Sequence, residues 1–190
     1  RRTPVIPDDK WRQAYLPLLE RKLGIPAAQM LIDAEIELGR QSRPAGDGAR
    51  PVLLFGPGLN WLPTDYTVLI HYLVLQGYII AAIAPVPVSP LAFRPGGEPV
   101  QGAPGTPDKY ELVAQDFLFA IRQLQRIDMD TAGVFYRRLD MHRVGVFGHS
   151  LSGAAAFLAA SLEPGIAAAA NLDGDLQEKS AVAQPKQPIL

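Results

Sequence analysis

A serine surrounded by small residues lies in Val144-Gly-Val-Phe-Gly-His-Ser-Leu-Ser-Gly153. The apolar residues before Gly148 favour a strand, and the Ala-rich residues after Gly153 favour a helix. A Gly148-x-Ser150 turn at such a junction is typical of a nucleophile elbow, in which the serine hydroxyl projects above the end of the sheet. Only small neighbours fit so sharp a turn, and Ser152 stands where a glycine is more usual. Because Gly-x-Ser also occurs by chance in ordinary turns, the surrounding elements have to support this interpretation.

Segments on both sides alternate between strand-like and helix-like patterns. Short continuous apolar runs, typical of strands buried on both faces, occur at 51–55, 78–83, 143–147 and 165–171. Three helices are predicted. The first covers 67–76, the second begins after a Thr106 cap with Pro107 at the first helical position, and the third covers 153–162. Strands that alternate with helices predict a parallel sheet.

Two other segments leave alternatives open. Residues 10–23 have helical character but contain Pro17, which predicts a broken or peripheral helix. The segment 87–107 is rich in Pro and Gly and includes Leu91 and Phe93. It either lines or covers an acyl pocket or forms a plain surface connection.

The composition indicates one globular domain over residues 1–190. The chain is 48% hydrophobic and 19% charged, and its longest apolar stretches are too short for a membrane-spanning helix. A formal net charge of −1 without basic runs argues against a nucleic-acid partner. The absence of cysteine excludes a disulfide, a thiolate metal site and a cysteine nucleophile, and it fits a secreted or a cytoplasmic protein.

A glycine-rich loop follows the first predicted strand, in Phe55-Gly-Pro-Gly-Leu-Asn60. In α/β-hydrolases, a backbone N–H from this loop and the N–H after the nucleophile bind the oxyanion of the reaction intermediate. Here those amides belong to Leu59 and Leu151. The two leucines are equally suited to be apolar lining, and both roles are compatible.

Four segments together resemble the platelet-activating-factor acetylhydrolase family and its bacterial relatives. They are Phe55-Gly-Pro-Gly-Leu59, Gly77-Tyr-Ile-Ile-Ala-Ala82, Arg143-Val-Gly-Val-Phe-Gly-His-Ser150 and Ala170-Asn-Leu-Asp-Gly174, and the match runs from about Tyr15 to the end. The resemblance implies an α/β-hydrolase fold with a mostly parallel central sheet, helices on both faces, and short or oxidised acyl chains on a lipid or small carboxylic ester.

The same resemblance implies a catalytic acid soon after the nucleophile, in a Leu-Asp-Gly-like segment. That residue is Asp173, 173 − 150 = 23 residues after Ser150. Ordinary lipases and polyester hydrolases place the acid one strand later. Asp173 also follows the predicted strand at its C-terminal end, where catalytic groups gather in open α/β sheets. Asp175 is the second choice, and a loop-capping role is the alternative for Asp173.

No histidine follows Asp173, although α/β-hydrolases supply the base in the order Ser, acid, His. His142 begins the strand that Ser150 ends, roughly 20 Å or more away at the rise of a strand. His149 is expected to point away from the serine hydroxyl in a packing or loop-bonding role, and His71 in a helix is expected to be structural.

We therefore expect the catalytic His in a C-terminal segment or in a second chain. Gln187-Pro-Ile-Leu190 has the pattern of a starting core strand, and Arg1 stands where an initiator Met would be. The chain is accordingly expected to be incomplete at both ends, through processing, trimming or partial representation.

These patterns predict a serine esterase that acts on small-molecule or lipid esters through an acyl-enzyme on Ser150. No metal or organic cofactor is implied, because acid–base groups and backbone amides suffice for acyl transfer. Two alternatives are a polyester or cutin-type hydrolase, which would use a later acid, and a non-catalytic hydrolase-fold protein that binds a hydrophobic ligand or partner.

Overall fold

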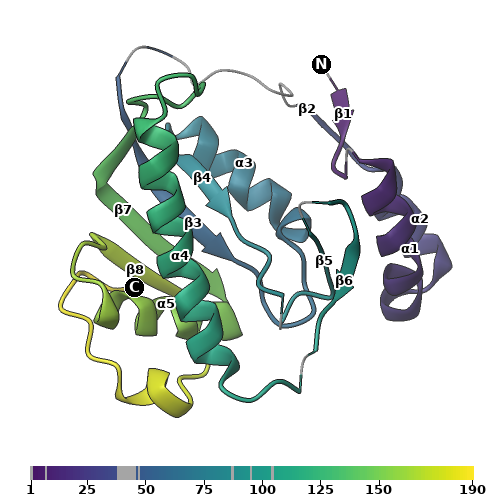
Figure 1. The fold of residues 1–190 in the computed structure, drawn as a ribbon. Coiled ribbons are helices and arrows are strands. Elements are labelled where there is room, and N and C mark those ends of the chain that lie inside the picture. The colour runs from purple at the N-terminus through teal and green to yellow at the C-terminus, as the bar shows by residue number, and fades with distance from the viewer. Residues whose placement is uncertain are drawn as a thin grey trace.

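The computed structural model describes residues 2–6, 8–37, 46, 48–86, 88–94, 96–103 and 105–190. Within these residues, four strands form a parallel sheet in the order β4-β3-β7-β8 (Figure 1). The strands are β3 (Arg50–Gly56), β4 (Ile79–Ala82), β7 (Leu139–His149) and β8 (Ala168–Leu172). Each matches an apolar run expected to form a strand, and the α/β architecture is confirmed.

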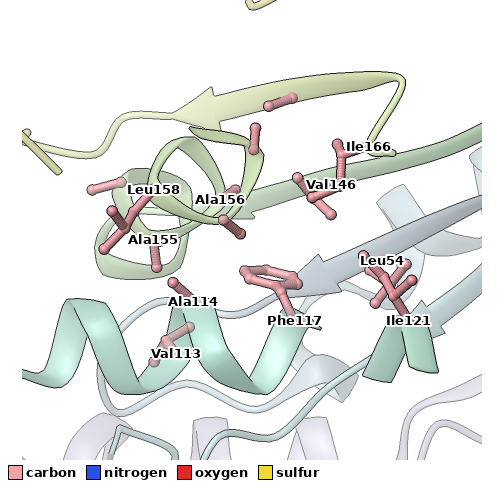
Figure 2. Packing of buried hydrophobic residues seen from close by; sticks show 14 of the residues in the cluster. Leu54, Val113, Ala114, Phe117, Ile121, Val146, Ala155, Ala156, Leu158 and Ile166 are labelled. Atoms are coloured by element: carbon pink, nitrogen blue, oxygen red, sulfur yellow. The ribbon is translucent and has the colours of Figure 1, made fainter. Parts of the chain in front are cut away.

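One face of the sheet is covered by α4 (Lys109–Met129) and α5 (Leu151–Leu162). Val52, Leu54, Val144 and Val146 of the strands are at most 1% exposed beneath these helices. Figure 2 shows α4 side chains, Phe117 among them, directed toward α5 and the strands. The alanines of α5 are also buried, and such small side chains let helix and sheet approach closely.

The opposite face carries α3 (Thr67–Leu75), so helices lie on both faces as expected. An apolar hollow of about 420 Å³ remains there beside α3. Its lining includes Leu53, Leu69, Leu73, Phe147, Ala168, Ala170, Leu172 and Ile189.

The expected start of the long helix α4 was wrong by about two residues. Thr106 does not cap the helix, because its hydroxyl donates to the carbonyl of Ala103 at 2.6 Å. The N-cap is Asp108, which adopts a left-handed φ of 53°, and the helix begins at Lys109. Thr106 and Pro107 therefore belong to the turn before the helix.

Residues before the sheet form a separate helical pair, α1 (Asp9–Leu23) and α2 (Ile25–Asp33). Of the two alternatives for this segment, a broken helix was wrong because α1 is continuous through Pro17, and a peripheral helix agrees with its place beside the main sheet (Figure 1). Asp8 caps the amides of Lys10 and Trp11, and Leu19 is 2% exposed in an apolar cluster shared with α2. Packing of this buried stripe compensates for the one backbone hydrogen bond that proline cannot donate.

The helical pair contacts the loops that follow β3 and β4. Its apolar cluster includes Leu62 and Leu91, both at most 2% exposed. Trp11 contacts Phe93 with ring centroids 4.6 Å apart. Phe93 belongs to a hairpin of β5 (Leu91–Phe93) and β6 (Pro99–Gln101), and a second antiparallel pair joins β1 (Arg2–Pro4) to β2 (Glu35–Glu37).

The last described residues lie beside β8, after a short 3-10 helix η2 (Glu178–Val182). Ile189 forms a parallel bridge with Ala169, and the Asn171 amide donates to the carbonyl of Leu190 at 2.8 Å. Residues 188–190 thus pair like the start of another strand, as their pattern predicted. None of the helices in the described part of the chain has the length and hydropathy needed to span a bilayer.

Candidate active site

Ser150 occupies the sharp turn between β7 and α5. Its φ of 53° and ψ of −123° lie in a region that non-glycine residues rarely adopt, at a cost of about 1–3 kcal/mol. The Ser150 amide donates to the carbonyl of Leu172 in β8 at 2.8 Å, and the Ser150 carbonyl accepts from the amides of Gly153 and Ala154. Neighbouring strand and helix therefore hold the strained backbone from both sides.

The small residues of this turn, which we call the elbow (residues 148–153), are required by backbone contacts. A Cβ atom on Gly148 would lie 2.5 Å from the carbonyl carbon of Ser152. A Cβ on Gly153 would lie 2.1 Å from Oδ1 of Asn171 and 2.7 Å from the carbonyl oxygen of Gly148. Both glycines allow the helix to start directly against the end of the strand.

We expect Gly153→Ala to lower the free energy of unfolding by about 1–3 kcal/mol, because the added methyl would overlap atoms that cannot move independently. Urea unfolding followed by circular dichroism measures this difference. Gly105→Ala is the matched control, since a Cβ at Gly105 meets nothing within 4 Å. Equal stability of the two variants would contradict the tight-turn argument.

The contacts of Ser152 account for a serine, in place of the more usual glycine, at the second small position after Ser150. Its side chain is fully buried, and its hydroxyl donates to the carbonyl of Pro57 at 2.5 Å. Pro57 belongs to the loop after β3, so Ser152 connects the elbow to that loop. A glycine at this position would lack this connection.

Asp173 lies directly after β8, on the segment that contacts the elbow. It adopts a left-handed φ of 58°, and its side chain is exposed. The Asn171 side chain fixes the turn by bonding both the amide and the carbonyl of Gly174, at 3.0 and 2.8 Å. A Cβ on Gly174 would lie 2.3 Å from the Ser150 carbonyl oxygen, so Asp173 is one residue from a direct backbone contact with Ser150. Asp175, also exposed, is two residues further along.

Most backbone amides in the loop after β3 donate a hydrogen bond to another group of the protein. The Gly58 amide donates to the Tyr66 hydroxyl, and the Asn60 amide donates to the Val88 carbonyl. The Trp61 amide donates to the Gly58 carbonyl, and the Leu62 amide donates to the Asp65 carboxylate. The amide of Leu59 has no acceptor among the described residues. Leu151 is the first residue of α5, where backbone amides have no partner within the helix. The two amides expected from the sequence therefore have no protein acceptor among the described residues.

The side chains of Leu59 and Leu151 also serve as apolar lining. Leu151 is 5% exposed within the main core, and Leu59 packs against the same cluster. The burial of these side chains agrees with the lining role, and the oxyanion role stays a prediction.

The three histidines lie on two elements, α3 and β7, and β7 begins at Leu139, before His142, the expected first residue of the strand. His142 is exposed on β7, and His71 lies in α3. His149 hydrogen-bonds the Tyr66 hydroxyl through Nδ1 at 2.7 Å, which is a loop-bonding role. Sequence reasoning missed Tyr66 altogether, because it is 83 residues from His149 and no local pattern connects them.

A half-buried carboxylate supports the same loop from the side of α1. Asp65 accepts the Tyr15 hydroxyl at 2.9 Å and the Leu62 amide at 2.8 Å. Burial raises the pKa of the Asp65 carboxyl, and hydrogen bonds from Leu62 and Tyr15 partly oppose this rise. Nearby, the Lys22 ammonium donates to the Asn60 carbonyl at 3.1 Å and lies 3.2 Å from the centroid of the Trp61 ring. The helical pair therefore braces the loop that carries Leu59.

Loss of the Tyr15 hydroxyl should destabilise the protein in a pH-dependent way. A carboxyl whose pKa is raised on folding contributes stability below its unfolded pKa and loses that stability as pH rises through the folded value. The Tyr15 hydroxyl favours the ionised form of Asp65 and limits this loss. Tyr15→Phe should therefore cost about 1–3 kcal/mol near neutral pH, and less near pH 4.

Urea unfolding of wild type and variant at both pH values measures the effect. Tyr78→Phe provides the control, since Tyr78 is 37% exposed. The role assigned to Asp65 would be contradicted if the loss of unfolding free energy in Tyr15→Phe were constant or became smaller as pH rises.

No group of three or more His, Cys, Asp or Glu side chains suited to a metal ion occurs among the described residues. The structure instead combines a strained serine, two amides without a protein acceptor among the described residues, and a nearby aspartate turn at the C-terminal ends of parallel strands. The fold and this elbow define the class as hydrolase-like α/β proteins.

Comparison with solved structures agrees with this class. The chain is similar to a ferulic acid esterase from Streptomyces cinnamoneus, with 25% sequence identity and a TM-score of 0.66 over 91% of this chain and 49% of that chain. It is also similar in fold to DcsB, solved in complex with its substrate analogue, with 17% identity and a TM-score of 0.52 over 69% of this chain and 39% of that one. The chain thus spans about half or less of the length of these structures.

The chain matches no protein-family model and no curated protein sequence. Neither solved structure is named as a platelet-activating-factor acetylhydrolase. Membership of that particular family therefore stays a prediction.

Proposed function

We propose that this chain carries the nucleophile half of a serine esterase, with Ser150 as the attacking residue. The observation that supports this most is the pairing of a strained serine turn with a loop in which Leu59 alone, of residues 58–62, keeps an amide without an acceptor among the described residues. An amide without a protein acceptor in the loop after this strand is where an α/β-hydrolase has an oxyanion donor.

In the proposed mechanism, Ser150 attacks the ester carbonyl and forms an acyl-enzyme that water then hydrolyses. The amides of Leu59 and Leu151 bind the negative oxygen of the tetrahedral intermediate. Leu151 also begins α5, and the positive end of the helix dipole favours negative charge there.

Asp173 is proposed to orient the imidazole that removes the proton from Ser150. Its position after β8 agrees with this role, since the turn at Gly174 contacts the Ser150 carbonyl. Among the described residues, no hydrogen bond joins the Ser150 hydroxyl to a histidine: His142 is distant along β7, His71 lies within α3, and Nδ1 of His149 bonds Tyr66. We therefore propose that the base comes from outside these 190 residues, either from a C-terminal segment or from a second chain.

The proposed substrates are carboxylic esters with a short or lipid-type acyl group. The esterase named among the similar structures supports ester hydrolysis, and its ferulic acid specificity adds aromatic acyl esters to the candidates. The acetylhydrolase resemblance favours small acyl groups over polymers.

A substrate panel tests the proposal. The complete protein would be assayed with p-nitrophenyl acetate, butyrate and decanoate, with methyl ferulate, and with the matching anilides. Hydrolysis of at least one ester class with little cleavage of the anilides is the expected result. Failure with every ester, together with tight binding of a fluorescent fatty acid, would instead favour a non-catalytic binding protein.

A further inference from the structure

Tyr66 connects the two segments that carry the proposed oxyanion amides. It ends the 3-10 helix η1 (Pro63–Tyr66), which leads into α3. Its hydroxyl accepts a hydrogen bond from the Gly58 amide at 3.2 Å and is 2.7 Å from Nδ1 of His149. Gly58 immediately precedes Leu59, and His149 immediately precedes Ser150. A single hydroxyl therefore lies between the oxyanion loop and the nucleophile turn.

The chemistry of a phenol suits this position. A tyrosine hydroxyl has one proton and two acceptor lone pairs, so it accepts from Gly58 and still bonds His149 in either tautomer of the imidazole. Burial raises the pKa of Tyr66, which keeps the hydroxyl protonated. The same bond also occupies the Gly58 amide, so the next amide along the loop is the one that remains for a ligand.

The surroundings leave Tyr66 and His149 little freedom to move. The Tyr66 ring contacts Phe55 edge-on with centroids 4.8 Å apart, and its centroid lies 5.6 Å from that of His149. A Cβ on Gly58 would lie 2.6 Å from Nδ1 of His149, so only glycine permits this approach of loop and imidazole. The distance between the loop and the elbow is thus set on one side by the Tyr66 bridge and on the other by Ser152 and Pro57.

We propose that Tyr66 is a positioning residue that acts through His149 to hold the Leu59 amide at the distance from Ser150 that the oxyanion requires. This inference rests on the proposed esterase function and deepens it. Neither Tyr66 nor His149 touches the reacting atoms in this proposal. Their hydrogen bond fixes the spacing of two backbone segments, and the catalytic gain comes from the amide so positioned.

Kinetics of Tyr66→Phe in the complete protein test the proposal. Removing the hydroxyl should lower kcat about tenfold to hundredfold while KM changes little, because a misplaced oxyanion donor weakens transition-state binding more than substrate binding. Affinity for a trifluoromethyl ketone, which mimics the tetrahedral intermediate, should fall in parallel. Tyr72→Phe is the matched control, since Tyr72 lies in α3 and is 60% exposed.

A double-mutant cycle tests whether Tyr66 acts through His149. His149→Leu should lower kcat to a similar extent, and combining it with Tyr66→Phe should cost little more than either change alone. His149→Asn retains a hydrogen-bonding group near the position of Nδ1 and should recover part of the lost rate. Thermal unfolding of each variant checks that it is folded, and His149→Leu provides the test if Tyr66→Phe is not.

Different outcomes separate this inference from the function on which it rests. Full kcat and ketone affinity in folded Tyr66→Phe, with Ser150 still essential, would overturn the positioning role alone. Additive effects of the two variants would also overturn it. If wild type hydrolyses no ester and Ser150 does not react with a serine-directed probe, the proposed esterase function is contradicted, and the positioning role of Tyr66 with it.

Discussion

Ser150→Ala is expected to remove ester hydrolysis by the complete protein, with a fall in kcat of about 10⁴-fold or more. Loss of a serine nucleophile leaves only the rate that the oxyanion amides and substrate binding provide. Alanine keeps the Cβ at the strained φ of 53°, so the turn should retain its shape. Initial rates on the preferred ester, with thermal unfolding of the variant, measure both effects.

Ser161→Ala provides the matched control for this variant. Ser161 lies in α5, the helix that follows Ser150, and its hydroxyl donates to the Leu158 carbonyl one turn earlier. We expect wild-type kinetics from it. If Ser150→Ala retained more than a small fraction of the wild-type rate, another nucleophile would be required.

Asp173→Asn is expected to lower kcat by about 10³- to 10⁴-fold with little change in stability. The amide cannot hold the imidazole in the required tautomer or stabilise its charged form, which is the basis of the large effect in other triads. Asparagine tolerates left-handed backbone well, so the φ of 58° should not be disturbed. Stopped-flow or steady-state rates at saturating ester give the change.

Asp175→Asn is the control, because this exposed carboxylate is two residues further along the same loop. It should keep wild-type kcat. A normal rate in Asp173→Asn would indicate that the acid lies on a later strand, as in polyester and cutin-type hydrolases. A large loss in Asp175→Asn alone would move the acid to that residue.

The sequence predicted the sheet well because its two central strands, β3 and β7, are buried along most of the part that packs in the sheet. Such strands are continuous apolar runs, and those at 51–55 and 143–147 lie within β3 and β7 of the structure. The turn at Ser150 was also predictable, since a strand, small residues and an Ala-rich helix leave few other arrangements. The close approach of Gly153 to the Asn171 side chain follows from the crowding of atoms in this turn.

Local patterns failed where distant segments decide the outcome. Pro17 suggested a broken helix, but the buried stripe of α1 against α2 keeps the helix continuous. Thr106 resembled a helix cap, yet its hydroxyl bonds backward to Ala103 and the helix starts later. In both places, tertiary packing or a neighbouring turn outweighed a preference read from a few residues.

The supports of the candidate site were less predictable than its central residues. Ser150 and Leu59 stand out because each lies in a recognisable glycine-containing turn at the end of a strand. Tyr66, Asp65 and Tyr15 carry no such signal, because each acts through a contact made only in the folded chain. Sequence alone therefore predicts the candidate catalytic residues more readily than the groups that hold them in position.

Covalent labelling with a fluorophosphonate probe tests the identity of the nucleophile most directly. Intact mass of the complete protein would be recorded before and after reaction, followed by peptide mapping, with Ser150→Ala treated in the same way. We expect one adduct, located on Ser150 and missing from the variant. An unlabelled, correctly folded protein, or an adduct on a different residue, would contradict the assignment of Ser150 as the nucleophile of a serine esterase.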